Sequence, residues 1–199
     1  RRERQMTGDA QRPYVPGRSW AAWARAIAWL VPRGLRVADL GCGDGALAVE
    51  MARFAPQVVG VDRDAALVKR ARETAAGVAN VRFRRADIER LPYAEASFDV
   101  AVLAQCLHAT PDPGAALAEA ARVLVPGGRV LVLDLQPHGE EWVRERLGHR
   151  TLGFAPHEME TLLAAAGLCD VRTERLGSRG GDPFRPLLAT GVRPEVPDA

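Results

Sequence analysis

The chain has 199 residues, of which 47% are hydrophobic and 26% are charged, and its formal net charge is +2 at pH 7. This length and balance suit one globular domain with its own core, and the small, dispersed charge gives no support to a nucleic-acid-binding surface. The three cysteines are widely spaced and odd in number, which argues against a disulfide framework and a zinc site and favours a reducing cytoplasm.

The first predicted element is a helix over residues 19–30, in which apolar side chains recur at steps of three and four behind Ser19 as N-cap. Its apolar run contains Arg25, is too short to span a bilayer, and is not followed by a signal-cleavage pattern. Pro32 and Gly34 end the helix. No membrane partner is therefore expected.

Strands and helices then alternate along the chain. Short apolar runs predict buried strands, and the amphipathic runs between them predict helices. The expected strands are residues 35–40, 57–62, 81–87, 97–105 and 128–135, the last after a PGG turn, and the expected helices are 46–54, 64–76 and 113–124. This alternation predicts a parallel sheet with helices on both faces.

The C-terminal part departs from this alternation. A helix is predicted over residues 157–167, and the apolar runs 169–176 and 184–192 follow it. Only a glycine-rich loop separates these two runs, which is too short for a helical crossover. They are therefore expected to pair as antiparallel strands.

A short helix is also predicted after the fifth strand. Trp142, Val143 and Leu147 form an apolar stripe at helical spacing, and Gly148 is the candidate helix end. Because chain beyond the carboxyl ends of parallel strands covers the ligand crevice, residues 140–154 are predicted to form a lid that closes over a ligand and excludes water. The alternative is a permanently packed helix that completes the core.

The segment VADLGCGDG, residues 37–45, follows the first strand of the sheet. Three residues satisfy the pattern G-x-G-x-x-[GA]: Gly41, Gly43 and Ala46. Asp62 follows about 20 residues later at a strand end, as in dinucleotide-binding enzymes. Asp39 and Asp44, however, would place carboxylates where a pyrophosphate needs amides and positive charge. S-adenosylmethionine carries an ammonium and a sulfonium group and no phosphate, so it suits this loop better.

Four segments, in order, resemble the class I S-adenosylmethionine-dependent methyltransferases. They are VADLGCGDG at 37–45, VVGVDRD at 58–64, RADIERLPYAEASFDVAVL at 85–103 and RVLVPGGRVLVLDL at 122–135. The resemblance covers nearly the whole chain and implies a Rossmann-like α/β fold. The expected sheet has seven strands, mostly parallel, with an antiparallel C-terminal strand and helices on both faces.

The ends of the chain show a second resemblance, to the methyltransferase portion fused behind winged-helix regulators of the ArsR type. It lies in YVPGRSWAAWA at 14–24, EEWVRERLGHRTLGF at 140–154 and GDPFRPLLATG at 181–191. This resemblance implies that residues 1–17 are a segment linked to an upstream domain. Residues 18–199 are then the S-adenosylmethionine-binding domain.

The resemblance implies cofactor contacts at Asp39, Gly41, Cys42, Gly43, Asp62, Arg63, Asp87, Ile88 and Gln105. Asp39 would hold the methionine portion, directly or through water, and Asp62 would accept both ribose hydroxyls. Asp87 and Ile88 would address the adenine, and Gln105 would border the transferred methyl group. The alternative for each polar residue is ordinary turn or helix-cap chemistry.

Methyl transfer from a sulfonium is an in-line displacement, so a general base is optional. His108, after the fourth strand, stands where a proton acceptor could face the substrate, and His138 follows the fifth strand. Packing in a loop or capping a helix is the alternative for both. His149 is expected in a solvated lid and His157 at a helix start.

The cysteines raise a second chemistry, because arsenic-methylating relatives of this fold bind trivalent arsenic through thiolates. Cys42 lies in the glycine loop, Cys106 follows the fourth strand and Cys169 opens a later strand. Convergence of all three is not expected, and small buried side chains are the default role. No metal site is predicted.

The expected function is therefore methyl transfer from S-adenosyl-L-methionine to a small-molecule acceptor by a cytoplasmic enzyme. The acceptor pocket is expected from residues 14–20 and 142–154. The alternative is a regulatory domain that senses S-adenosylmethionine or S-adenosylhomocysteine with little or no turnover. A nucleic-acid partner is not expected for this domain alone, and a homodimer is left open.

Overall fold

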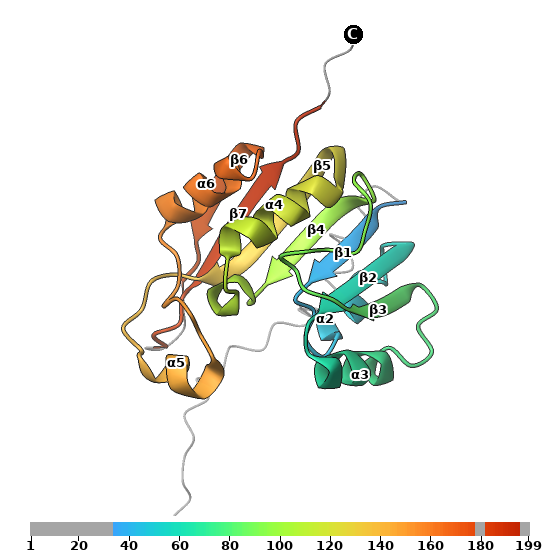
Figure 1. Cartoon of the computed structure of the whole chain (residues 1–199), viewed down its shortest axis with the longest axis horizontal. Coiled ribbons are helices and arrows are strands. Elements are labelled where there is room, and N and C mark those ends of the chain that lie inside the picture. Colours follow the sequence, from blue (N-terminus) through green and yellow to red (C-terminus); the bar gives the residue numbers. More distant parts are fainter. Residues whose placement is uncertain (1–33, 178–181, 196–199) are drawn as a thin grey trace, which may run out of the picture. The chain divides into compact units, whose positions relative to one another are not determined.

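A seven-stranded sheet organises the part of the chain that the computed structural model describes, residues 34–177 and 182–195 (Figure 1). Its strands are β1 (Arg36–Leu40), β2 (Gln57–Asp62), β3 (Val81–Arg85), β4 (Phe98–Ala104), β5 (Leu124–Leu135), β6 (Cys169–Arg175) and β7 (Pro186–Val192). The predicted helix over residues 19–30 and the predicted boundary near residue 17 lie outside the described residues.

The strand order is β3-β2-β1-β4-β5-β7-β6. Neighbours from β3 to β5 are parallel, whereas β7 runs antiparallel to both β5 and β6. The sheet therefore confirms the expected mostly parallel arrangement with an antiparallel C-terminal strand. Between β1 and β4 the chain changes direction across the sheet, which is the topological switch point at which such folds bind ligands.

Helices cover the sheet because successive side chains of each strand point to opposite faces. On β1, Val37 belongs to one buried cluster and Ala38 to the other. The helices are α2 (Ala46–Met51), α3 (Ala65–Thr74), α4 (Pro113–Val123), α5 (Trp142–Leu147) and α6 (Pro156–Ala165), with a 3₁₀ turn, η1 (Leu107–Ala109). The first cluster includes side chains of α2 and α3, and the second includes side chains of α4 and α6, which lie side by side over one face in Figure 1.

Helix starts follow the polar residues that the sequence places before them. The Asp64 carboxylate accepts hydrogen bonds from the Ala66 and Leu67 amides at the start of α3. Asp112 accepts one from the Ala115 amide at the start of α4. Each cap satisfies backbone donors that have no partner within the helix.

The fifth strand begins earlier than the sequence indicates. The expected PGG turn is present within the assigned strand: Gly127 has a φ of 76°, and the pairing with β4 shifts register between Leu124, opposite Phe98, and Arg129, opposite Val100. The Gly127 amide donates to the Arg193 carbonyl at 2.9 Å, and the Arg193 amide donates to the Gly128 carbonyl at 2.8 Å. Chain far away in the sequence thus bonds to both glycines of the turn, and Gly127 supplies the positive φ that the turn requires.

Only one of the three members of the predicted apolar stripe on α5 is buried. Val143 is fully buried, but Trp142 is 43% exposed and Leu147 is 58% exposed. The Trp142 indole N–H donates to the Glu140 carboxylate at 2.7 Å, so the ring has a polar partner near solvent. The predicted end of the helix is confirmed, because Gly148 adopts the left-handed conformation with φ of 73°.

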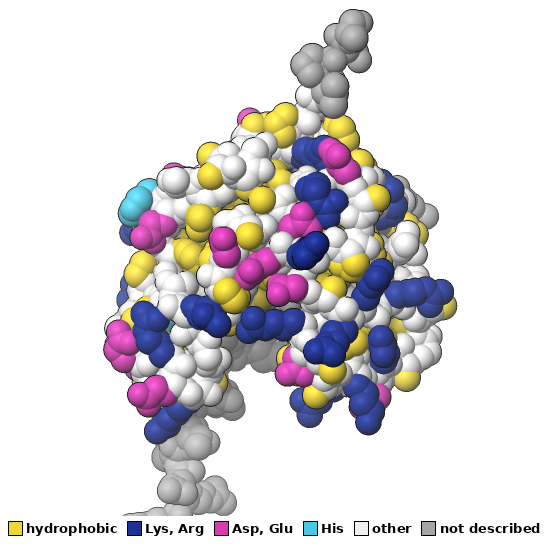
Figure 2. All heavy atoms as spheres, viewed as in Figure 1, with side chains coloured by type: hydrophobic (Ala, Val, Ile, Leu, Met, Phe, Trp, Pro, Cys, Tyr) yellow, Lys and Arg dark blue, Asp and Glu magenta, His cyan; other side chains and the backbone are white. Residues whose placement is uncertain are grey.

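Basic side chains are spread over the face shown in Figure 2, with acidic side chains among them. Within the described ranges, no helix is long and apolar enough to cross a membrane.

Candidate functional site

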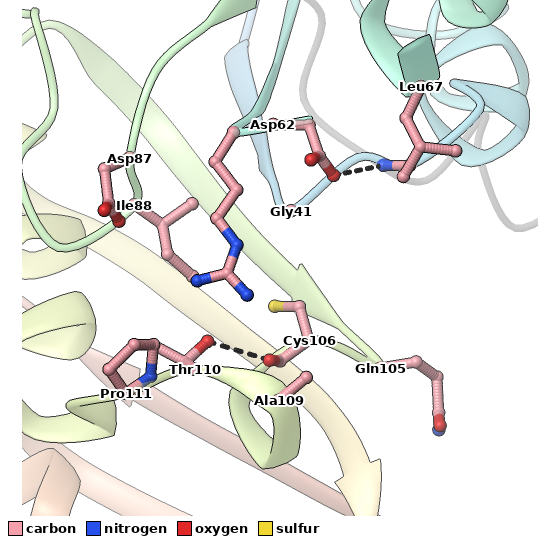
Figure 3. Close-up of a pocket in the computed structure, with 12 residues that line it drawn as sticks. Gly41, Asp62, Leu67, Asp87, Ile88, Gln105, Cys106, Ala109, Thr110 and Pro111 are labelled. Carbon is pink, nitrogen blue, oxygen red and sulfur yellow. Dashed lines mark hydrogen bonds between the residues drawn. The ribbon is translucent and has the colours of Figure 1, made fainter. Parts of the chain in front are cut away.

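A cavity of about 250 Å³ lies at the carboxyl ends of the central strands, at the switch point between β1 and β4 (Figure 3). Its lining comes from the glycine loop, the ends of β2 and β4, the start of α3 and the loop after β3. The lining residues are Gly41, Gly43, Asp62, Arg63, Leu67, Asp87, Ile88, Gln105, Cys106, Ala109, Thr110 and Pro111. Seven of the nine predicted cofactor residues are among them, and Asp39 and Cys42 are not.

The glycine loop turns sharply between β1 and α2. Gly41 has a φ of 79°, and a Cβ atom there would lie 2.6 Å from the Cβ of Cys106. The Gly41 and Cys42 amides both donate to the Val61 carbonyl, at 2.8 and 2.9 Å. The missing side chain at residue 41 therefore lets the chain after β4 pack against the loop, in addition to clearing the cavity.

Asp62, the last residue of β2, holds its carboxylate in a fixed orientation. The Gly43 amide donates to Oδ2 at 3.0 Å, and the Asp64 amide donates to Oδ1 at 2.9 Å. Figure 3 shows this carboxylate beside the glycine loop and across the cavity from Cys106. Each oxygen keeps a lone pair that can accept a further hydrogen bond from a ligand hydroxyl.

Asp39 lies behind the loop, 1% exposed, and its Oδ2 has no hydrogen-bond partner. The pKa of Asp39 is raised from 3.8 to about 7; burial is the main cause, the Ala48 amide opposes the shift, and the nearby Asp62 charge adds to it. An unpartnered carboxylate oxygen in a buried place is unfavourable unless a cation or a donor reaches it.

Cys42 is part of the glycine loop, and its side chain is buried. Burial is the main cause that raises the pKa of its thiol to about 12, and neighbouring carboxylates add to the shift. The thiol is therefore protonated at neutral pH. The backbone of Cys42 belongs to the loop, and a cofactor contact by this residue stays a prediction.

Opposite ends of the cavity differ in character (Figure 3). At one end Ile88 is buried, and the Asp87 Oδ1 accepts the Glu89 amide at 3.0 Å. At the other end Gln105 has a φ of 55°, and its backbone amide donates to the Leu133 carbonyl at 2.7 Å. A non-glycine residue in the left-handed region stores strain, and such residues gather at functional sites.

Five lining residues were missed by sequence reasoning: Leu67, Cys106, Ala109, Thr110 and Pro111. The last four follow β4 in or beside η1, where the Thr110 hydroxyl donates to the Cys106 carbonyl at 2.8 Å. Cys106 Sγ in turn donates to the Leu40 carbonyl at 3.2 Å. The only sequence signal for the four residues after β4 was their position in the chain, because the end of β4 borders the switch point.

His108, the predicted proton acceptor, does not line this cavity. It is 5% exposed, and its Nδ1 lies 2.7 Å from Asp134 Oδ1. The expectation of a solvated His149 is wrong, because its ring packs on His108 with a centroid distance of 4.0 Å. Burial lowers the pKa of His149. The catalytic role of His108 stays a prediction.

The cysteines do not converge on one another. Cys42 and Cys106 lie near the glycine loop, whereas Cys169 opens β6, beyond β5 and β7 from the site. In the described part of the chain, no group of three or more His, Cys, Asp or Glu residues is arranged to hold a metal ion.

Comparisons with known proteins give the family. The Methyltransferase domain family matches residues 38–132. The ubiquinone biosynthesis O-methyltransferase of Hahella chejuensis is 35% identical over 173 residues, a match that covers 78% of this chain and 69% of that protein. The demethylmenaquinone methyltransferase of Deinococcus radiodurans is 42% identical over 125 residues, with 60% of this chain and 51% of that protein covered.

A solved structure shows the same fold. The S-adenosylmethionine-dependent methyltransferase from Mesorhizobium loti superposes with a TM-score of 0.70 at 22% identity, over 87% of this chain and 98% of that one. The family match runs from within β1 to within β5 and includes every residue that lines the cavity. The chain therefore belongs to the methyltransferase-domain family and has the Rossmann-like fold of class I S-adenosylmethionine-dependent methyltransferases.

Proposed function

We propose that this chain transfers the methyl group of S-adenosylmethionine to a small-molecule acceptor. The observation that carries the proposal is the Asp62 carboxylate, which two backbone amides hold at the edge of a glycine-lined cavity. A ribose presents two neighbouring hydroxyl donors, and a fixed carboxylate with two oxygens matches them.

The remaining charges also fit this cofactor. Asp39 places an unpartnered, buried oxygen behind the loop, and the ammonium group of the methionine portion would supply the missing cation, directly or through water. Asp87 would accept from the adenine amine, and Ile88 would pack on its ring. The pyrophosphate of a dinucleotide would instead meet the carboxylate of Asp39 where it needs amides and positive charge.

The protein's part in the transfer is positioning. S-adenosylmethionine supplies an activated methyl group on sulfur when bound. The strained Gln105 and its neighbours after β4 border the end of the cavity opposite Asp87, where the methyl group would face its acceptor. Holding both reactants in line and free of water accounts for much of the rate that such a reaction needs.

The acceptor class is suggested by two relatives. One relative is named as a ubiquinone biosynthesis O-methyltransferase and the other as a demethylmenaquinone methyltransferase. They support a small-molecule acceptor here. The resemblance to portions fused behind ArsR-type regulators, the cytoplasmic location and the predicted domain boundary stay predictions.

Titration calorimetry tests the proposal. S-adenosylmethionine and S-adenosylhomocysteine should bind with dissociation constants on the order of micromolar, and NAD should not bind. Asp62→Ala should weaken binding by roughly 1–3 kcal/mol, because ribose hydroxyls lose a charged acceptor. The matched control is Asp99→Ala, which removes a carboxylate bonded to Arg36 at the other end of β1.

Turnover separates an enzyme from a cofactor sensor. Mass spectrometry of candidate acceptors incubated with labelled cofactor should detect methylated product and S-adenosylhomocysteine together. Comparable NAD binding would refute the cofactor assignment. Tight cofactor binding without product from any acceptor would favour the regulatory alternative.

A further inference from the structure

A second cavity, of about 550 Å³, lies at the carboxyl ends of β5 and β6. It is lined by residues 136–139, which follow β5, by Arg175, the last residue of β6, and by Asp182, Pro183 and Arg185, which precede β7. None of these residues lines the proposed cofactor cavity. This second cavity, here called the arginine cavity, therefore offers a separate place for a ligand at the same edge of the sheet.

Hydrogen bonds hold the backbone that carries both arginines. The Gln136 side-chain Nε2 donates to the Leu176 carbonyl at 2.9 Å and to the Pro186 carbonyl at 2.7 Å. The Gln136 backbone amide donates to the Arg185 carbonyl at 2.7 Å. One residue after β5 thus joins the end of β6 to the start of β7, which fixes where Arg175 and Arg185 leave the sheet.

The pairing of β6 with β7 places both arginines on one face of the sheet. Arg175 pairs with Leu187, and Arg185 precedes Leu187 by two residues. The Leu176 amide donates to the Pro186 carbonyl at 2.9 Å, so the antiparallel ladder continues to this point. Because side chains alternate along extended chain, Arg175 and Arg185 are diagonal neighbours with α-carbons about 7–8 Å apart. Both guanidinium groups can therefore reach the same ligand.

Positive charge exceeds negative charge in the lining of the arginine cavity. Within the described ranges, neither Arg175 nor Arg185 forms an ion pair. Burial is the main cause that lowers the pKa of His138, so this ring adds no charge near pH 7. Two guanidinium groups thus share the lining with one carboxylate, that of Asp182. An anion bound between the guanidinium groups would relieve their mutual repulsion.

Other acidic side chains near His138 have partners of their own. The Glu140 carboxylate accepts the Trp142 indole N–H at 2.7 Å, and Glu141 forms an ion pair with Arg144 at 2.9 Å. Neither glutamate is part of the lining of the arginine cavity. They therefore do not occupy the place of an incoming anion.

Most of the remaining lining is apolar. Pro137 and Pro183 present ring carbons, and Gly139 carries no side chain. The His138 ring packs edge to face on Phe184, with ring centroids 4.9 Å apart. Apolar and aromatic walls with a few charged groups are typical of sites for small organic ligands. The lining therefore suits a carboxylate that is attached to a flat apolar body.

The distance between the two cavities can be spanned by one acceptor. Gln105, at the proposed methyl end of the cofactor cavity, donates through its backbone amide to the Leu133 carbonyl. Gln136, in the lining of the arginine cavity, follows Leu133 by three residues, which is about 10 Å of extended strand. An acceptor held in the arginine cavity would thus reach the methyl group with an atom on the order of 10 Å from its carboxylate.

We infer that the arginine cavity binds a carboxylate of the methyl acceptor, and that Arg175 and Arg185 select for this charge. The inference rests on the proposed function and specifies its acceptor as an elongated organic acid with an apolar body. Neither arginine takes part in the transfer itself. A guanidinium can donate two parallel N–H bonds to the two oxygens of a carboxylate, a geometry that a neutral amide does not match.

Two aromatic probes of the same shape test the charge requirement. Titration calorimetry measures how biphenyl-4-carboxylate and the neutral biphenyl-4-carboxamide bind to the full chain saturated with S-adenosylhomocysteine. The carboxylate should bind at least tenfold more tightly than the amide. Arg175→Gln and Arg185→Gln should each weaken binding of the carboxylate at least fivefold and leave binding of the amide unchanged. Both arginines are exposed, so both variants should unfold at the wild-type temperature.

Arg172→Gln is the matched control. Arg172 is an exposed arginine of the same strand, three residues before Arg175, and its side chain therefore points to the opposite face. This variant should bind both probes as the wild type does.

Equal binding of the two probes overturns the inference, as does tight binding of the carboxylate that both variants retain. Displacement of the carboxylate by an equal concentration of inorganic phosphate also overturns it, because the cavity would then not distinguish an organic acid from a free anion. Calorimetry with S-adenosylhomocysteine alone separates the two proposals. If that product binds and the carboxylate does not, only this inference fails, whereas no binding of the product refutes the proposed function.

Discussion

Asp39 makes the stability of the ligand-free protein depend on pH in an unusual direction. Its pKa is about 7 in the folded chain, against an ordinary value of 3.8, because burial penalises the charged form. Between these two values the folded state binds more protons than the unfolded state. The free energy of unfolding therefore falls as the pH rises, and the loss is complete above pH 7.

The size of the effect follows from the shift. About three pKa units at about 1.4 kcal/mol each give about 4 kcal/mol in total. Between pH 5 and pH 8 the wild type should lose roughly 2–3 kcal/mol relative to Asp39→Asn, which cannot ionise. Urea unfolding of both proteins at several pH values measures this difference, and comparison with the variant cancels the titration of all other groups.

Cofactor binding should remove the destabilisation that ionised Asp39 causes in the ligand-free protein. If the ammonium group of S-adenosylhomocysteine reaches Asp39, the bound carboxyl is ionised, and about half a proton should be released at pH 7. Calorimetry in two buffers of different ionisation enthalpy counts that proton. A stability difference between wild type and Asp39→Asn that stays constant from pH 5 to pH 8 would refute the reasoning.

Three further predictions follow from packing. Gly41→Ala should destabilise the protein by about 1–3 kcal/mol in thermal unfolding, because the new Cβ would lie 2.6 Å from Cys106 Cβ in a left-handed conformation, and unchanged stability would contradict this contact. Val143→Ala should cost about 1–3 kcal/mol while Leu147→Ala stays within about 0.5 kcal/mol, since only Val143 is buried, and equal effects in urea unfolding would contradict the burial. Hydrogen exchange of residues 140–154 should slow when cofactor and acceptor bind, whereas equal, strong protection with and without ligands would exclude a lid.

Local signals predicted the parallel half of the fold well. The strand predicted over residues 57–62 has those bounds in the structure, because a β-branched run ends there at an aspartate that begins a turn. The start of β5 was missed because Leu124 pairs with Phe98 on the far side of the PGG turn, where the register shifts. Trp142 was assigned to an apolar face because spacing alone does not show that its indole N–H bonds to Glu140.

The candidate site also contains some residues that the sequence predicted and others that it did not. Asp62 was predicted from its spacing after the glycine loop and from the family resemblance, and Gln105 from that resemblance alone. The contact between His108 and His149 joins two loops, and no periodic pattern connects them. Asp134 was unremarked because a single aspartate in an apolar strand becomes informative only when its partner, His108, is placed beside it.

The insertion of β7 between β5 and β6 has a consequence for synthesis of the chain. β6 leaves the ribosome before β7, yet its only neighbour in the described sheet is β7. Until residues 186–192 emerge, the outer edge of β5 and all of β6 lack backbone partners. The nascent protein therefore carries an open sheet edge that other chains can pair with, and a ribosome that pauses before Pro186 prolongs that exposure.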